Sequence, residues 1–260
     1  MSRLHVVLLK PSKYDLRGFV ERFWRGFMPN ATLLYMSALT PNQINGTDIQ
    51  VTCIDEYVHT NTQYLKLLCP GKGEKVLLAL VGTQSHQFHR AADLAAYAVV
   101  NGCMAIIGGP HPMTCDTSML HGKGVSFCQA EAELVWPQIL SDAIKGELAP
   151  VYGQAQRWTS ALESPVLVPA SARDRQRYLG DMQGIYPARG CPKTCDFCSV
   201  IMIAGRNVRG QSIDVTIESL KLAQAAGVKL IMFTSDNFNK YAQVAALLDA
   251  MIIAGIRIPF

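Results

Sequence analysis

Short apolar runs alternate with helical patterns in the first part of the chain, and this alternation restricts the fold more than any other feature. Five runs of strand length lie at residues 4–9, 49–54, 76–81, 104–107 and 125–128. After the third run, apolar residues recur at helical spacing from Phe88 to Val99, and Gly102 follows as a helix C-cap. This rhythm predicts an α/β fold with an open, Rossmann-like parallel sheet that binds ligands at the carboxyl ends of its strands.

A second β-α rhythm begins near Gly184 with a strand at residues 184–188. A helix from Ser212 to Gly227, a strand at 228–233, a helix before Gly255 and the start of a third strand at 256–260 are expected to follow. Residues 149–181 contain three prolines, break the rhythm and predict an ordered linker. The expected domains are therefore 1–148, a linker at 149–181, and a second β-α domain at 182–260.

Composition favours a soluble, cytoplasmic enzyme. Of the 260 residues, 49% are hydrophobic and 17% are charged, and the net charge is +4 without a concentrated basic tract, so no nucleic-acid partner is expected. No apolar run approaches the roughly 18 residues that a membrane span requires. The N-terminal apolar segment is too short for a signal peptide.

Cys191, Cys195 and Cys198 lie in one short loop, separated by three and then two residues. Three thiolates can ligate three irons of a four-iron cluster and leave the fourth iron open to a substrate. Zinc is the alternative, but no second cysteine pair lies nearby. A disulfide framework does not suit scattered cysteines without a secretory signal. The other cysteines are expected to be ordinary buried or half-buried thiols: Cys53, Cys69, Cys103, Cys115 and Cys128.

The spacing of this loop resembles that of the radical S-adenosylmethionine (radical SAM) enzymes. Their barrel has more β-α units than residues 182–260 provide, so the resemblance implies that these residues are the N-terminal part of an incomplete radical SAM (β/α) partial TIM barrel. It also implies that the chain is a fragment of a longer protein and inactive alone. The resemblance implies that Cys191, Cys195 and Cys198 bind a 4Fe-4S cluster whose open iron binds SAM. It places Phe197 beside the SAM adenine, although this ring could instead cap the cluster. It also implies that Thr234, Ser235 and Asp236 bind SAM, whereas Asp236 could alternatively cap the following helix. Arg206 and Arg209 could bind a carboxylate or form an exposed pair.

A parallel α/β domain before such a loop resembles the cobalamin-dependent radical SAM enzymes over nearly the whole chain. The resemblance implies that two loops flank the nucleotide tail of cobalamin. The cobalamin-binding residues that it implies are Thr83, Gln84, Ser85, Gly108, Gly109, Pro110 and His111. The loop at residues 10–18 contains no histidine, so cobalt is expected to lack a lower histidine ligand. A flavodoxin-like or Rossmann module for another nucleotide is the alternative, but no dinucleotide fingerprint follows the first strand.

Cobalamin and SAM together imply methyl transfer from SAM, via methylcobalamin, to an unactivated carbon of a small molecule. Four stretches, at residues 25–30, 86–90, 109–116 and 235–241, resemble the tryptophan 2-C-methyltransferases of thiopeptide biosynthesis. An external electron donor is also implied, whereas the sequence identifies no catalytic residue. Two alternatives stay open: a cobalamin-dependent radical SAM enzyme that cyclises or rearranges its substrate without methylating it, and a non-enzymatic iron-sulfur and cobalamin sensor.

Overall fold

The computed structural model describes residues 3–59 and 61–260, which form two compact units. The first unit consists of Thr40–Arg157 together with the chain before Arg25. The second consists of Arg25–Leu39 and Trp158–Phe260. Within the described ranges, no helix combines the length and the apolar character that crossing a membrane would require.

The first unit is built on a seven-stranded sheet in the order β2-β3-β1-β4-β5-β6-β7. All neighbouring strands are parallel except β2 and β3, which are antiparallel. The strands are β1 (Arg3–Lys10), β2 (Gln43–Ile44), β3 (Thr47–Asp55), β4 (Lys75–Leu80), β5 (Met104–Gly108), β6 (Val125–Cys128) and β7 (Val151–Tyr152). The helices are η1 (Gln63–Leu68), η2 (Ser85–Gln87), α2 (Phe88–Val100), α3 (Pro110–Thr114), η3 (Ser118–Leu120) and α4 (Ala132–Lys145). The predicted parallel α/β domain is thus confirmed.

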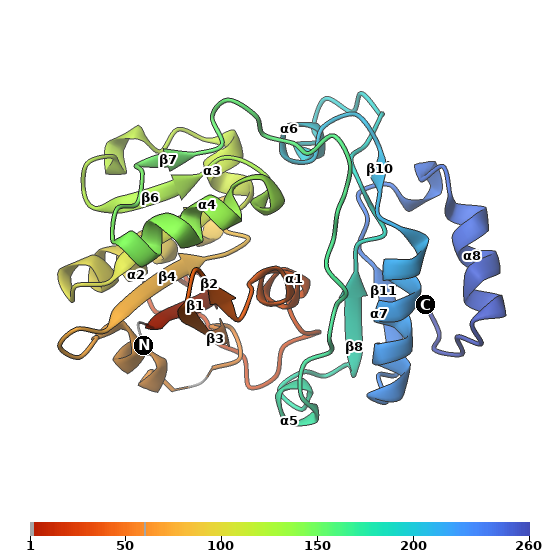
Figure 1. Ribbon diagram of the computed structural model, residues 1–260, viewed down its shortest axis with the longest axis horizontal. Coiled ribbons are helices and arrows are strands. Elements are labelled where there is room, and N and C mark those ends of the chain that lie inside the picture. The colour runs from red at the N-terminus through yellow and green to blue at the C-terminus, as the bar shows by residue number, and fades with distance from the viewer. Residues whose placement is uncertain (1–2, 60) are drawn as a thin grey trace. The chain divides into compact units, whose positions relative to one another are not determined.

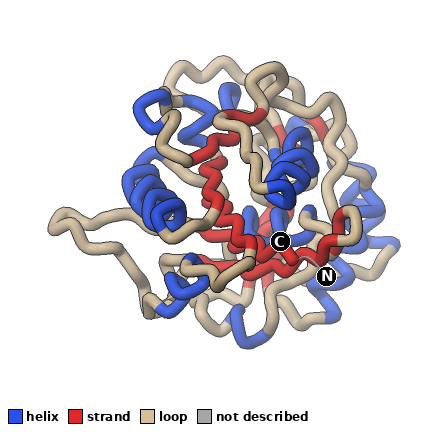
Figure 2. Tube along the Cα trace, turned by 60° about the vertical axis from the view of Figure 1, so that its left-hand side comes forward, coloured by secondary structure: helices blue, strands red, loops and turns tan. Residues whose placement is uncertain are grey.

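Both faces of the central strands β1, β4, β5 and β6 are buried, which explains why these strands are continuous apolar runs. Leu78 of β4 and Ile107 of β5 lie in one core with Leu94 of helix α2. The alternate residues Leu77 and Ile106 are also buried, and α4 contacts β4 (Figure 1). Figure 2 shows the strands, in red, and the helices, in blue, along the chain trace.

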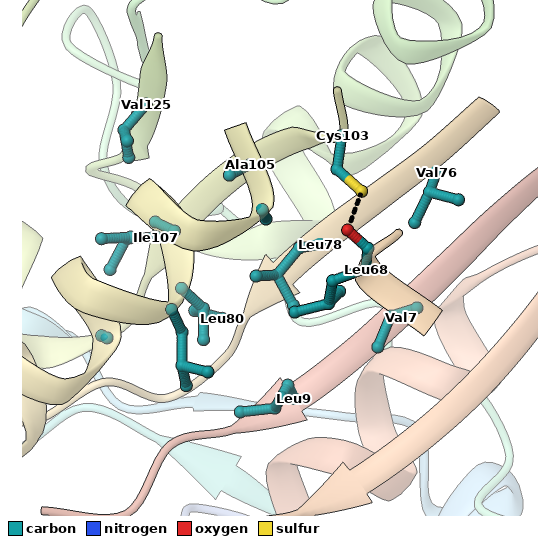
Figure 3. Packing of buried hydrophobic residues seen from close by; sticks show 14 of the residues in the cluster. Val7, Leu9, Leu68, Val76, Leu78, Leu80, Cys103, Ala105, Ile107 and Val125 are labelled. Atoms are coloured by element: carbon teal, nitrogen blue, oxygen red, sulfur yellow. Dashed lines mark hydrogen bonds between the residues drawn. The ribbon is translucent and has the colours of Figure 1, made fainter. Parts of the chain in front are cut away.

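Figure 3 shows the core around β4, where Val76, Leu78 and Leu80 lie among residues of β1 and β5. The Cys103 thiol belongs to this core and donates a hydrogen bond to the Leu68 carbonyl at 3.3 Å. Burial raises the pKa of Cys103 to about 11, so this thiol stays protonated and structural. Cys128 is buried too, as predicted, but the same prediction is wrong for three exposed cysteines: Cys53, Cys69 and Cys115.

The second unit contains two parallel strands, β8 (Met182–Ile185) and β11 (Leu230–Phe233), and an antiparallel pair, β9 (Ala188–Arg189) and β10 (Arg209–Gly210). Its helices are α1 (Ala31–Leu39), α5 (Ala172–Arg175), α6 (Val200–Ile203), α7 (Ile213–Ala225), η4 (Phe238–Lys240) and α8 (Val244–Ile253). Ile185 and Ile231 pack in one core with Leu220 of α7 and Leu247 of α8. The two predicted β-α repeats are therefore present, but the strand expected at residues 184–188 is two strands, because β8 ends at Ile185 and Ala188 belongs to β9.

Two features of the second unit differ from the sequence-based expectations. Residues 256–260 do not form a third strand: Pro259 accepts one backbone hydrogen bond from Ile231 at 2.9 Å, but it has no N–H with which to continue a ladder. Residues 25–39, which were expected in the first domain, pack in this unit. Tyr35 of α1 lies in its core, with the Arg189 guanidinium 4.7 Å from the centre of the ring.

A buried carboxylate stabilises the first unit just beyond β3. Glu56 accepts hydrogen bonds from Arg90 at 2.6–3.2 Å, from the backbone N–H of Ser12 at 3.0 Å and from the Tyr64 hydroxyl. Burial alone would raise the pKa of Glu56, but the hydrogen bonds from Arg90 and Tyr64 outweigh it and leave the pKa below its usual value. The ionised carboxylate is therefore the form that stabilises the fold.

We expect Glu56→Gln to lower the free energy of unfolding by about 3–5 kcal/mol, because it leaves the Arg90 charge without its buried partner. Because its pKa is depressed in the folded state, the Glu56 carboxylate stabilises the fold at pH values above the pKa of an unfolded glutamate, about 4.3. This contribution is lost as the pH falls through the lower folded pKa. Urea unfolding should therefore show a steeper loss of stability below about pH 5 in the unsubstituted protein than in the variant. Glu147→Gln, at an exposed position, is the matched control and should unfold like the unsubstituted protein.

Candidate functional site

The carboxyl ends of β4 and β5 bring the two predicted cofactor loops together. The backbone N–H of Thr83 donates to the Gly108 carbonyl at 2.9 Å, and the backbone N–H of His111 donates to the Thr83 carbonyl at 2.9 Å. His111 Nδ1 lies 3.1 Å from the Ser85 hydroxyl. Residues 83–85 and 108–111 thus form one continuous edge, as parallel neighbours in a sheet should.

Gly109 makes this close approach possible. It has a φ of +124°, and a Cβ at this position would lie 2.2 Å from the Thr83 backbone nitrogen. An L-residue would therefore meet both backbone strain and a collision that no rotamer change relieves. Glycine at position 109 is a requirement of the packing between the two loops.

The side chains on this edge present a mixed set of donors and acceptors. Gln84 and Ser85 are exposed, whereas the Thr83 hydroxyl is buried and finds no hydrogen-bond partner in the described part of the chain. The His111 ring stacks on Phe88 with 3.8 Å between ring centres. Burial, followed by the nearby His89, lowers the pKa of His111, so its imidazole is a neutral hydrogen-bonding group near pH 7.

Lys10, at the end of β1, supports the serine-bearing loop, a role that the sequence did not reveal. Its ammonium donates to the Gly82 carbonyl and, at 2.8 Å, to the side-chain carbonyl of Gln87. Gln87 in turn accepts from the Gln84 backbone N–H at 3.0 Å. Burial lowers the pKa of Lys10 to about 8, against the opposing effect of Asp55. The signal that could have indicated this role is the position of Lys10, directly after an apolar run and before Pro11.

In the second unit, the cysteine loop follows β9 and is anchored at its first residues. The Cys191 backbone N–H donates to the Gly205 carbonyl at 3.1 Å, and Arg206 donates to the Lys193 carbonyl at 3.2 Å. Gly190 has a φ of +100°, and a Cβ there would lie 2.2 Å from the Asn207 carbonyl oxygen. The loop therefore leaves β9 through a turn that only glycine fits.

The three cysteines share this loop but do not converge on one point. Cys191 and Cys198 are half-buried and Cys195 is exposed. Within residues 3–59 and 61–260, no group of three histidine, cysteine or acidic side chains has metal-binding geometry. Three accessible thiols within eight residues nevertheless form a donor set that suits an iron-sulfur cluster.

Thr234, Ser235 and Asp236 follow β11 and lie against the start of the cysteine loop. The Ser235 hydroxyl accepts from the Ala188 backbone N–H at 3.1 Å, and Asp236 Oδ2 accepts from the Gly190 backbone N–H at 2.8 Å. The alternative that Asp236 caps the next helix is not realised, because η4 has Asn237 at its N-cap position. The structure confirms that these residues directly follow a strand, and it reveals hydrogen bonds of their side chains that the sequence did not predict.

Phe197 and the two arginines have different environments. The Phe197 side chain is 89% exposed, so the ring has no protein surface to cover and is accessible to a ligand. Arg209 is buried and donates to Thr159 Oγ1 at 2.9 Å and to the Ala204 carbonyl, so an exposed Arg206–Arg209 pair is not present. Arg209 instead stabilises the backbone beneath the loop.

No protein-family model matches the chain. Among curated relatives, the bacteriochlorophyllide d C-12(1)-methyltransferase of Chlorobaculum tepidum is 27% identical over 168 residues, which are 62% of this chain and 36% of that protein. The chain thus spans only about a third of the length of this relative.

Solved structures of two proteins share the fold over almost the whole chain. The radical SAM methyltransferase TsrM from Kitasatospora setae, solved with tryptophan and a SAM analog, aligns with a TM-score of 0.67 and 14% identity over 96% of this chain and 51% of TsrM. A second TsrM structure holds cobalamin and a 4Fe-4S cluster. The cobalamin-dependent SAM radical enzyme OxsB aligns with a TM-score of 0.54 and 16% identity over 96% of this chain and 36% of OxsB. The predicted resemblance to cobalamin-dependent radical SAM enzymes is confirmed for the fold.

We expect Gly109→Ala to lower the free energy of unfolding by about 2–5 kcal/mol, because strain at positive φ adds to overlap with the Thr83 backbone. Gly146→Ala is the matched control, since Gly146 also has a positive φ of +89° but open space around its Cβ position. This control should cost only about 1–2 kcal/mol. Urea unfolding of both variants measures the difference; equal losses would contradict the close loop contact.

Proposed function

We propose that this protein is a cobalamin-dependent radical SAM methyltransferase that transfers a methyl group from SAM to an unactivated carbon of a small molecule. The observation that carries the proposal is the shared fold with TsrM over 96% of the chain, together with the three-cysteine loop in the second unit. The methyltransferase relative from Chlorobaculum tepidum supports the same reaction class.

The second unit would hold a 4Fe-4S cluster through Cys191, Cys195 and Cys198. Cys195 is exposed and the other two thiols are half-buried. None of the three is sealed in the core, so all three are accessible to iron. The exposed ring of Phe197 is available to stack on the adenine of SAM. Asp236 uses Oδ2 for the Gly190 N–H, and its exposed carboxylate retains acceptor capacity for the SAM amine.

The first unit would hold cobalamin along the edge formed by residues 83–85 and 108–111. Ser85 and Gln84 offer exposed polar groups to the nucleotide tail, and Gly108 and Gly109 allow a bulky ligand to approach the backbone. The loop after β1 offers no histidine, and Lys10 at its start is occupied by Gly82 and Gln87. When bound, cobalamin supplies a nucleophilic cobalt centre and the cluster supplies electrons to SAM.

Tryptophan, methylated at C2, is the substrate that we propose. TsrM has been solved with tryptophan, and four stretches of this chain resemble its methyltransferase type. An external electron donor would reduce the cofactors. The chain spans 51% of TsrM, so this substrate is proposed from a match to about half of that protein.

Replacing Cys191, Cys195 and Cys198 together by alanine should abolish cluster assembly and leave corrinoid binding unchanged, because the two sites belong to different units. Anaerobic reconstitution with iron, sulfide and hydroxocobalamin, followed by iron and sulfide analysis and absorption spectroscopy, tests both. Alanine at Cys53 and Cys69, which are exposed and lie in the first unit, provides the control. An unsubstituted protein that takes up neither cofactor contradicts the proposal.

The intact gene product, reconstituted and reduced, should transfer labelled methyl from SAM to C2 of tryptophan. Mass spectrometry of the product with methyl-labelled SAM measures the transfer. SAM consumption with an altered but unlabelled product would instead indicate a cyclising or rearranging enzyme. Cofactor uptake without any substrate-dependent SAM consumption would indicate a sensor. Label in another small molecule would retain methyl transfer and reject tryptophan.

A further inference from the structure

We infer that Asn237 is a positioning residue for the iron-sulfur cluster, donating a hydrogen bond to the sulfur of Cys191 and tuning the reduction potential. This inference rests on the proposed cluster. The observation behind it is a direct contact: Asn237 Nδ2 lies 3.3 Å from Cys191 Sγ. The two residues are 46 positions apart in sequence, so the contact comes from tertiary packing.

The contact belongs to a regular series of bonds at the end of β11. Thr234 donates its backbone N–H to the Ile185 carbonyl at 2.9 Å, in continuation of the β8–β11 pairing. The next two residues reach further along the opposite segment, with Ser235 bonded to Ala188 and Asp236 bonded to Gly190.

Asn237 completes this series and differs from its neighbours in one respect. Ser235 and Asp236 accept hydrogen bonds from backbone N–H groups, and these bonds fix the path of the chain. The Asn237 amide donates to a side chain, and that side chain is the first thiol of the cysteine loop. The series thus ends on a sulfur atom that the proposed cluster would use as a ligand.

The chemistry of the pair suits a cluster ligand better than a free thiol. A neutral cysteine sulfur is a weak acceptor, whereas a thiolate bound to iron carries negative charge and accepts more strongly. Hydrogen bonds to the sulfurs are among the factors that set the reduction potential of iron-sulfur clusters. A donor at Cys191 stabilises the more negative, reduced cluster and so raises the potential.

Asn237 is half-buried, and its contact with Cys191 is partly shielded from water. A hydrogen bond in such a position is stronger than one exposed to solvent. Asn239 is exposed on the short helix η4, which Asn237 immediately precedes, and it supplies a matched comparison.

The test compares Asn237→Asp, Asn237→Ala and the control Asn239→Ala after anaerobic reconstitution. Asn237→Asp keeps the shape of the side chain but replaces the donor with a negative acceptor. We expect both Asn237 variants to shift the midpoint potential to more negative values in a titration followed by electron paramagnetic resonance. We also expect about 10-fold faster iron loss to a chelator, the typical effect of removing a partner of a metal ligand. Asn239→Ala should match the unsubstituted protein in both measurements.

Each outcome has a defined meaning. An unchanged potential in folded Asn237 variants that retain the cluster overturns the inference and leaves the proposed function intact. Folded variants that bind corrinoid but assemble no cluster support it, because only the cysteine loop has then failed. If Asn237→Ala unfolds, the isosteric Asn237→Asp decides. An unsubstituted protein that assembles no cluster overturns the inference together with the proposed function.

Discussion

The parallel pairing of strands is the constraint on which both candidate sites depend. Parallel neighbours present their carboxyl ends at the same edge of a sheet, so the loops that follow them meet regardless of their distance in sequence. In the first unit, β4 and β5 bring the loop of Ser85 to that of His111. In the second, β8 and β11 bring the start of the cysteine loop to residues 234–237. Each unit therefore builds its site by the same geometric rule.

Glycine then determines how closely these loops can meet. At Gly109 the missing side chain leaves space for the Thr83 backbone, and at Gly190 it leaves space for the Asn207 carbonyl. Both residues also adopt positive φ, which other residues reach only with strain. The two positions immediately precede Pro110 and Cys191, which belong to the two proposed cofactor-binding loops. The absence of a side chain at these two glycines thus permits both the close backbone packing and the geometry of the candidate sites.

The sequence predicted β1, β3, β4, β5 and β6 of the first unit because buried parallel strands are continuous apolar runs bounded by turns. It did not predict β2 and β7, which have only two residues each, and β7 lies within the segment that was expected to be a linker. It also predicted the positions of the loops that we propose as cofactor-binding, since these loops follow the strands directly. It could not predict that residues 25–39 pack in the second unit, because that depends on long-range contacts such as Tyr35 with Arg189. The third strand was expected from the apolar character of residues 256–260, and Pro259 prevents its ladder from extending. The Asn237 contact likewise depends on strand register, which a single sequence does not reveal.

Under the proposed function, the series of bonds after β11 would also limit how SAM binds at this strand end. Ser235 accepts the backbone N–H of Ala188 in β9, and one oxygen of Asp236 accepts that of Gly190, directly before Cys191. A ligand that displaced these bonds would release the start of the loop that carries Cys191. A ligand amine can instead donate to the other carboxylate oxygen, Asp236 Oδ1, because the Gly190 N–H bonds to Oδ2. Binding at that oxygen places the ammonium beside a loop that stays anchored. The same carboxylate can therefore fix the cysteine loop and receive the ligand, which links the geometry of the proposed cluster to that of its substrate.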